Sequence, residues 1–110
     1  MTARFVVRFY NQDVAKEYKA LDGSVKKLVG IGLAKLRMRA DEIGKPLHGE
    51  LAGCKELKYR EAGLRVVFRI QGEEVEIVEI IAISARDKGK VFVVATRRLV
   101  AEPSNDSESI

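Results

Sequence analysis

A short stretch of the chain, residues 54–70, concentrates basic side chains in a pattern that could bind an anion. On both sides of Ala62-Gly63, apolar residues recur at every second position, which is typical of two strands joined by a turn. With Ala62-Gly63 as a two-residue hairpin loop, Arg60 would lie opposite Arg65, and directly opposite residues share a face of the sheet. The expected face carries four cations and one acid: Lys58, Arg60, Arg65, Arg69 and Glu56.

This basic face has two explanations. Like charges that face each other across two strands repel, so their concentration needs a reason. One explanation is a solvated surface over which the long stems of Lys and Arg lie. The other is an anion that all four cations reach, and polyphosphate is the obvious chemical class. The residues alone leave both explanations open, and Glu56 also has a structural interpretation as a cross-strand partner of Arg69.

The remaining pattern predicts the elements that would position these side chains. Residues 4–10 alternate like a half-buried strand, and residues 75–84 are nearly all apolar, as in a central strand. Two helices are expected between them, one capped by Asn11 and one by Ser24, and a third helix covers 91–99. The expected fold is an α+β domain of order β-α-α-β-β-β-α, in which a helical hairpin and a C-terminal helix pack on a small antiparallel sheet.

Two glycines, Gly30 and Gly32, stand inside the second predicted helix. Each weakens a helix by about 1 kcal/mol relative to alanine. Close packing between the helices of the hairpin would explain why they are there.

The chain has 110 residues, of which 46% are hydrophobic, so one globular domain with one core is expected. The net charge is +4, but the last ten residues contain three acids and neither Lys nor Arg. Without those three negative charges, residues 1–100 carry +7. We therefore expect a basic domain over 1–100, suited to an acidic or phosphate-bearing partner, and a disordered acidic tail over 101–110.

The sequence content argues against several other classes of protein. A single cysteine, Cys54, excludes an internal disulfide and suits a reducing compartment. One histidine, His48, and one cysteine do not build a zinc site by themselves, so we expect neither metal nor cofactor. No apolar run approaches the roughly 20 residues of a membrane span, and the N-terminus lacks the apolar region of a signal peptide. The expected location is the cytoplasm.

Three short segments stand in a characteristic order: Leu51-Ala-Gly53, Lys58-Tyr-Arg60 and Gly63-Leu-Arg65-Val-Val-Phe68. They follow the predicted helical hairpin and precede the apolar strand and the last helix. This arrangement, from residue 4 to residue 99, resembles the RelE/ParE superfamily of bacterial type II toxins. The resemblance covers the whole expected fold and favours the anion-binding explanation of the basic face.

That resemblance implies a reaction and a set of partners. RelE-type members are ribosome-dependent mRNA endonucleases (mRNA interferases) that inhibit translation. The 2′-hydroxyl attacks the adjacent phosphate and leaves a cyclic phosphate and a free 5′-hydroxyl, without a metal. A cognate antitoxin binds and blocks such a toxin. The implied partners are therefore an antitoxin protein and the ribosome with its bound mRNA, with no membrane involved.

The resemblance also implies roles for individual residues. Lys58 matches a catalytic lysine that can act as a base. Arg65 matches the arginine that stabilises the phosphate, and Arg86 matches the second arginine of the site. Arg60 and Arg69 would add to substrate binding.

Two departures from the family pattern affect the assignment of acid and base. Glu56 stands where a second lysine is expected, and Phe92 stands where a tyrosine is expected. Phe92 can stack on a nucleobase as a substrate-binding residue, but it has no hydroxyl, and Tyr59 alternates onto the opposite face of its strand. His48 and Glu56 are therefore the candidates for general acid or base.

Two other functions stay open at this point. One is a ParE-like inhibitor of DNA gyrase that cuts no RNA, and the other is a non-catalytic binding module of the same fold. The combination of Lys58, Arg65 and Arg86 favours the nuclease, because a gyrase inhibitor has no need of a phosphate site.

Overall fold

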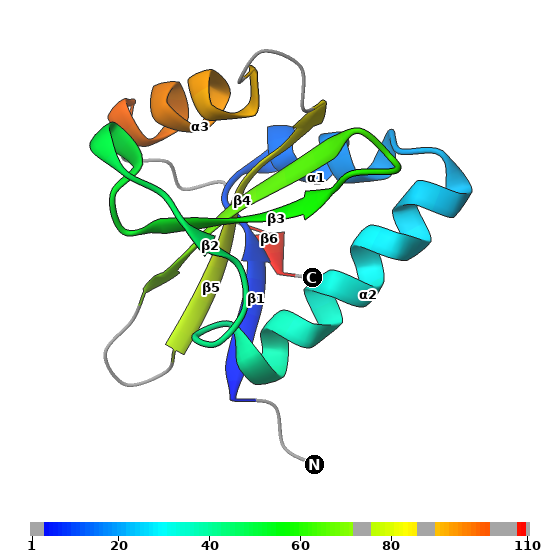
Figure 1. Cartoon of the computed structure of the whole chain (residues 1–110), viewed down its shortest axis with the longest axis horizontal. Helices are drawn as coiled ribbons and strands as arrows, with labels where there is room; N and C mark the ends of the chain where they lie inside the picture. The colour runs from blue at the N-terminus through cyan, green and yellow to red at the C-terminus, as the bar shows by residue number, and fades with distance from the viewer. Residues whose placement is uncertain (1–3, 72–75, 86–89, 102–107, 110) are drawn as a thin grey trace.

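The computed structural model of the chain describes residues 4–71, 76–85, 90–101 and 108–109. The elements, in order, are β1 (Phe5–Phe9), α1 (Gln12–Lys19), α2 (Gly23–Arg39), β2 (Lys45–Pro46), the one-turn 3₁₀ helix η1 (Gly49–Leu51), β3 (Cys54–Tyr59), β4 (Leu64–Gln71), β5 (Glu76–Ala85), α3 (Lys90–Val100) and β6 (Glu108–Ser109). The three α-helices pack against one sheet, which confirms the predicted α+β class (Figure 1). The short elements β2, η1 and β6 were not predicted.

The sheet has the strand order β2-β3-β4-β5-β1-β6 and is mixed. The consecutive strands β3, β4 and β5 form the predicted antiparallel meander. β1 instead pairs in parallel with β5, with Phe5 beside Glu76 and Phe9 beside Ile80. The sheet differs at this strand from the antiparallel sheet expected, because the two helices that follow β1 provide a crossover that a short hairpin turn does not.

The β3–β4 hairpin has a longer loop than predicted. Lys58 pairs with Arg65, and the loop comprises residues 60–63, in which the Gly63 amide donates to the Arg60 carbonyl at 3.1 Å. Gly63 has a φ of 62°, a left-handed conformation that glycine adopts without strain. The predicted pairing of Arg60 with Arg65 was therefore wrong by two residues. A shift of two nevertheless keeps the paired residues of β3 and β4 on their predicted faces, whereas Arg60 lies in the loop and not on the predicted face.

Side-chain caps fix where the first two helices begin. The Oδ1 of Asn11 accepts a hydrogen bond from the Val14 amide at 3.1 Å, as predicted for this cap. The cap of α2 is Asp22 rather than Ser24, because the Oδ1 of Asp22 accepts from the amides of Ser24 and Val25 at 3.0 and 3.2 Å. The second helix consequently begins earlier than expected, at Gly23.

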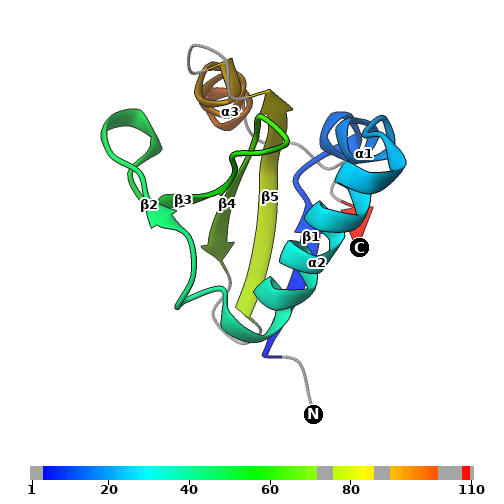
Figure 2. The same cartoon turned by 45° about the vertical axis from the view of Figure 1, so that its right-hand side comes forward.

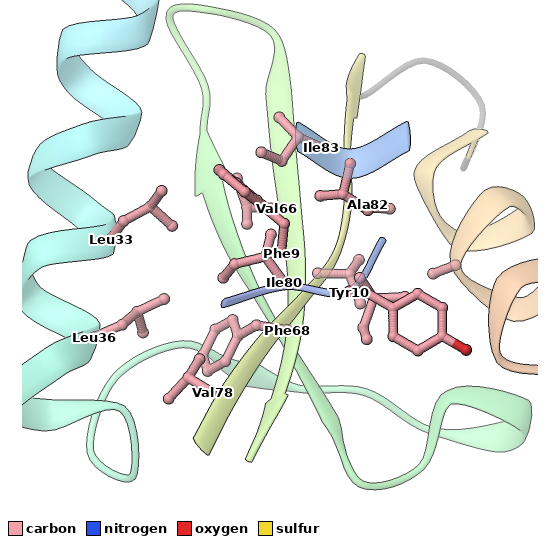
Figure 3. Packing of buried hydrophobic residues seen from close by; sticks show 14 of the residues in the cluster. Phe9, Tyr10, Leu33, Leu36, Val66, Phe68, Val78, Ile80, Ala82 and Ile83 are labelled. Carbon is pink, nitrogen blue, oxygen red and sulfur yellow. The ribbon is translucent and has the colours of Figure 1, made fainter. Parts of the chain in front are cut away.

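Different helices cover the two faces of the β3–β4 hairpin. In Figure 1 and Figure 2, α2 and α3 lie on opposite sides of the strands. Leu33 and Leu36 of α2 point toward Phe68 of β4, and all three side chains are buried (Figure 3). Arg65 precedes Phe68 on β4 by three residues, so its side chain points to the other face and contacts Phe92 of α3. Alternation along β4 thus divides its side chains between an α2 face and an α3 face.

Both glycines of α2 lie close to a tyrosine. A Cβ at Gly32 would lie less than 3.0 Å from the Tyr59 hydroxyl of β3, and a Cβ at Gly30 would lie 3.1 Å from the Tyr18 hydroxyl of α1. Helix–helix packing therefore explains Gly30, whereas Gly32 makes room for a strand. Tyr59 lies on the α2 face, as its alternation with Lys58 predicted.

A polar network attaches the end of α3 to α1 and to a bulge in β5. The register of β4 against β5 shifts after Val67, so that Ile81 is the extra residue of β5. Arg98 of α3 donates through its two Nη atoms to Glu17 of α1, at 3.0 and 2.6 Å, and also to the Ile81 carbonyl at 2.8 Å. Glu17 accepts in addition from the Ile83 amide at 3.1 Å. These bonds hold α3 over the face that carries Arg65.

Two predictions concern residues beyond the described ranges. Arg86 lies outside the described residues, and the residue before it, Ala85, ends β5 opposite Leu64. Most of the predicted tail, 101–110, lies outside them as well. Its Glu108–Ser109 segment forms β6, which pairs with the outer edge of β1.

Candidate active site

A buried carboxylate joins two cations on the α3 face of the hairpin. The side chain of Glu56 is only 3% exposed, whereas those of Lys58 and Arg65 are 30% and 21% exposed. Arg65 Nη1 donates to Glu56 Oε2 at 3.3 Å, and Lys58 Nζ lies 3.7 Å from Glu56 Oε1. We call these three residues the charged cluster. Its formal charge is +1, because one carboxylate faces two cations.

The strand register explains this arrangement. Lys58 and Arg65 are direct cross-strand neighbours, and two like charges at such positions repel each other. Glu56 precedes Lys58 by two residues, so it shares their face and places one oxygen near each cation. The carboxylate therefore holds both cations in place and reduces their repulsion.

Arg65 also contacts the aromatic ring of α3. Its guanidinium carbon lies 5.1 Å from the centroid of the Phe92 ring, within the range of a cation–π interaction. Within the described part of the chain, the Nε of Arg65 is buried and has no hydrogen-bond partner. An arginine has five N–H donors, so the bond to Glu56 leaves others for an anion.

A shallow groove borders this cluster on the far side of Phe92. One hollow of about 350 Å³ lies between η1 and α3 and is lined by Leu47, His48, Glu50, Leu51, Phe92 and Thr96. A second hollow of about 370 Å³ shares Glu50, Phe92 and Thr96 and extends to Val93 and Arg97. We call the two together the η1–α3 groove. It brings His48, which is exposed, onto the same surface as Phe92.

Two of the predicted substrate-binding arginines are not members of the charged cluster. Arg60 is exposed in the hairpin loop and lines a different hollow, which it shares with Lys58 and with Leu28 of α2. Arg69 is 14% exposed, and its Nε donates to Glu79 of β5 at 2.8 Å. The alternative pairing of Arg69 with Glu56 was wrong, because Glu56 lies opposite Val67 in the observed register.

Sequence reasoning missed three polar residues of the η1–α3 groove: Glu50, Thr96 and Arg97. Thr96 follows Phe92 by four residues, so helical periodicity places the two on one face of α3. That signal was present in the sequence. Glu50 gave no comparable signal, because it reaches the groove only through the packing of η1 against α3.

Other titratable groups of β3 are unsuited to act as nucleophile or base. Burial raises the pKa of the Cys54 thiol, although the charge of Arg69 partly opposes this effect. Burial also raises the pKa of the Tyr59 phenol. Both groups therefore stay protonated at neutral pH, and a protonated thiol is a poor nucleophile.

Among the residues that the structure describes, no three His, Cys, Asp or Glu side chains lie together so as to hold a metal ion. None of the described helices has both the length and the apolar composition that crossing a bilayer requires.

Comparison with known proteins gives a consistent set of relatives, although no family model matches the chain. An Escherichia coli protein named as a RelE-like toxin is 26% identical over 96 residues, which cover 87% of this chain and 98% of that protein. A double-arginine mutant of E. coli toxin RelE in the free state superposes with a TM-score of 0.68 at 22% identity, covering 90% of this chain and 99% of that one. The Mycobacterium tuberculosis toxin–antitoxin complex RelBE2 contains a chain with a TM-score of 0.62 at 24% identity, covering 78% and 95%.

The fold and the curated relative agree on the class of protein. The solved structures share the architecture over nearly their whole length, and the RelE-like relative aligns over nearly all of its own. The chain is therefore similar in sequence to a RelE-like toxin and has the fold of the solved RelE structures.

Proposed function

We propose that this protein is the toxin of a type II toxin–antitoxin module and acts as a ribosome-dependent, metal-independent mRNA endonuclease. The observation that carries the proposal is the charged cluster, in which Lys58 and Arg65 are partly exposed beside the aromatic ring of Phe92. A stacking ring next to two cations suits a single-stranded nucleic acid, which presents both flat bases and phosphates. The name of the RelE-like relative supports the toxin assignment.

The proposed reaction cleaves RNA through its own 2′-hydroxyl. The 2′-oxygen forms a bond to the neighbouring phosphorus, the bond from phosphorus to the 5′-oxygen breaks, and the products are a cyclic phosphate and a free 5′-hydroxyl. Negative charge builds up on the phosphoryl oxygens in the transition state, and guanidinium donors stabilise it. Arg65 has this role in the proposal, since it has donors beyond the one that Glu56 accepts.

Two proton transfers accompany this reaction, one from the 2′-hydroxyl and one to the leaving 5′-oxygen. Lys58 reaches solvent from the charged cluster and is our candidate for the first transfer. Glu56 is almost fully buried and has an oxygen near each cation, so we assign it to positioning rather than to proton transfer. His48, exposed in the η1–α3 groove, is the candidate acid. Arg86 completes the proposal as a second phosphate-binding arginine on the strength of the family resemblance.

The proposed partners follow from the same surface. The charged cluster contributes +1 to the net charge of +4 of the chain, and this positive charge favours binding to ribosomal RNA and to mRNA. A cognate antitoxin would block this surface, and the solved complexes of RelE relatives with antitoxins support such a partner.

The direct test adds purified protein to a bacterial translation extract and maps the 5′ ends of the mRNA by primer extension. We expect cuts in ribosome-bound mRNA, with the cleavage rate reduced about 100- to 1,000-fold in Arg65→Ala, the range for removing one transition-state donor. Lys58→Ala and Arg86→Ala should also lose most activity. Lys16→Ala is the matched control, because Lys16 is an exposed lysine on α1, away from the cluster.

Three results would decide against the nuclease. Intact mRNA at full inhibition of translation would point to ribosome binding without cleavage. Intact mRNA together with loss of DNA supercoiling would identify a gyrase inhibitor instead. Cleavage that persists unchanged in Arg65→Ala would separate the activity from the charged cluster.

A further inference from the structure

We propose that the η1–α3 groove binds one nucleobase of the RNA and that Glu50 selects a base with an exocyclic amino group over uracil. The proposal rests on the proposed function in one respect, that the ligand of this surface is RNA. It adds a specificity-determining residue that lies outside the charged cluster.

The dimensions of the groove suit a planar group. Its two hollows of about 350 and 370 Å³ lie at the low end of the range of roughly 300–1,000 Å³ for small-molecule sites. A docked amphipathic helix would need a row of pockets for side chains at i, i+3, i+4 and i+7. Two adjoining hollows, both lined by Phe92 and Thr96, offer a site for one flat ring instead.

Phe92 connects the groove to the charged cluster. Its ring is half-buried, contacts the guanidinium of Arg65 and lines both hollows. A base stacked on such a ring gains about 1–3 kcal/mol, and every base can stack, so stacking alone gives only a modest sequence preference. A base held there would have its phosphate near Arg65.

The charges around the groove fit a nucleotide chain. Arg97 lines one end of the groove, and Arg65 lies beside Phe92 at its border with the charged cluster. A nucleotide that spans these positions presents a phosphate to a cation at each end, with its base between them. This charge pattern favours a phosphate-bearing chain over an uncharged peptide face as the occupant.

Glu50 supplies the selection. It is exposed and lines both hollows. An ionised carboxylate accepts hydrogen bonds but donates none, so it pairs with amino groups such as the N4 amino of cytosine. Adenine and guanine present such groups as well. Uracil has no amino group, and its N3–H lies between two carbonyl oxygens that a carboxylate repels.

The test measures base binding without cleavage. The full chain, labelled with ¹⁵N, is titrated at low salt with the 2′-O-methylated dinucleotides ApA and UpU, which cannot be cut through the blocked hydroxyl. We expect ApA to shift the amide signals of Glu50, Leu51, Phe92 and Thr96 and to bind about fivefold more tightly than UpU. Glu50→Gln should lower that ratio to the modest preference that stacking on Phe92 gives. Glu42→Gln is the matched control, since Glu42 is also exposed but lies after α2.

The outcomes separate this inference from the nuclease assignment. Equal binding of ApA and UpU by the unchanged protein, or shifts confined to the charged cluster, would overturn the base site even if mRNA is cut. Selective binding of ApA without mRNA cleavage would uphold the base site and refute the nuclease. If neither dinucleotide binds the groove but a co-expressed antitoxin protects its amides from hydrogen exchange, the groove is a protein-binding surface. This result would overturn the proposal.

Discussion

The two faces of the β3–β4 hairpin carry opposite kinds of side chain. On the α2 face, Tyr59 and Phe68 are covered by a helix that has a glycine where the tyrosine approaches it. On the α3 face, Lys58 and Arg65 stay partly exposed around the buried Glu56. Residues one position apart in the sequence therefore serve different purposes. The α2 face contributes to the free energy of unfolding, and the α3 face is available for chemistry.

This division gives a criterion for testing the molecule. A substitution on the α2 face should lower the free energy of unfolding, and any loss of activity should follow from unfolding. A substitution on the α3 face should change RNA binding or cleavage in protein that is still folded.

Phe68→Ala should give the largest effect, a loss of about 3–5 kcal/mol in the free energy of unfolding. The side chain of Phe68 is fully buried between α2 and the sheet, and its ring also lies against Gly44. Urea denaturation followed by circular dichroism measures the change. If Phe68→Ala kept the unchanged unfolding midpoint, the α2 face would not be the main core of the domain.

Glu56→Gln should lower the free energy of unfolding by about 1–3 kcal/mol, because two facing cations lose the carboxylate between them. The local charge rises from +1 to +2, so non-specific RNA binding should strengthen. The slope of log affinity against log salt should steepen by up to about 1. Cleavage should fall nonetheless, since Arg65 loses the group that orients it.

Fluorescence anisotropy of a labelled RNA over a range of KCl concentrations measures this slope. Glu42→Gln, at an exposed glutamate remote from the cluster, controls for the change in net charge alone. Weaker RNA binding by Glu56→Gln than by Glu42→Gln would show that Glu56 does more than balance charge.

The division into two faces could be predicted from the sequence, but the contacts within each face could not. Alternation assigned Lys58 and Arg65 to one face and Tyr59 to the other, and this assignment holds for any loop with an even number of residues. The register depends on the loop, and Ala62-Gly63 did not reveal that the loop has four residues. The pairing within the charged cluster changed as a result.

Longer-range contacts explain the other differences. Arg69 pairs with Glu79 of β5, and the alternating pattern of β4 carries no information about its partner on the next strand. The η1–α3 groove joins a loop and a helix more than 40 residues apart in sequence, so Glu50 and Thr96 could be placed together only in the folded chain. Local signals such as the Asn11 cap were read correctly, because they depend on a few neighbouring residues.

Gly32→Ala should lower the free energy of unfolding by about 1 kcal/mol, although alanine favours helices over glycine by about the same amount. The new Cβ would lie too close to the Tyr59 hydroxyl, so the ring must shift. The double mutant Gly32→Ala/Tyr59→Phe should recover part of the loss, since it removes that oxygen. Gly30→Ala is the matched control with a milder contact of 3.1 Å to Tyr18. Increased stability of Gly32→Ala alone would contradict this account of the α2 face.

The smallest effect is expected at the start of α2, where Asp22→Asn replaces an ionised cap by a neutral one. Hydrogen bonds from the Val25 amide and then from Ser24 lower the pKa of Asp22 below its ordinary value. Its charge therefore stabilises the fold above the unfolded pKa of about 3.9, and this contribution is lost as the pH falls through the lower folded value. Asparagine caps helices well but lacks the charge that favours the helix dipole. Urea unfolding should thus show a slightly larger free energy of unfolding for the unchanged protein than for Asp22→Asn at pH 7, and no such difference in strong acid. An equal difference at both pH values would mean that the cap acts without its charge.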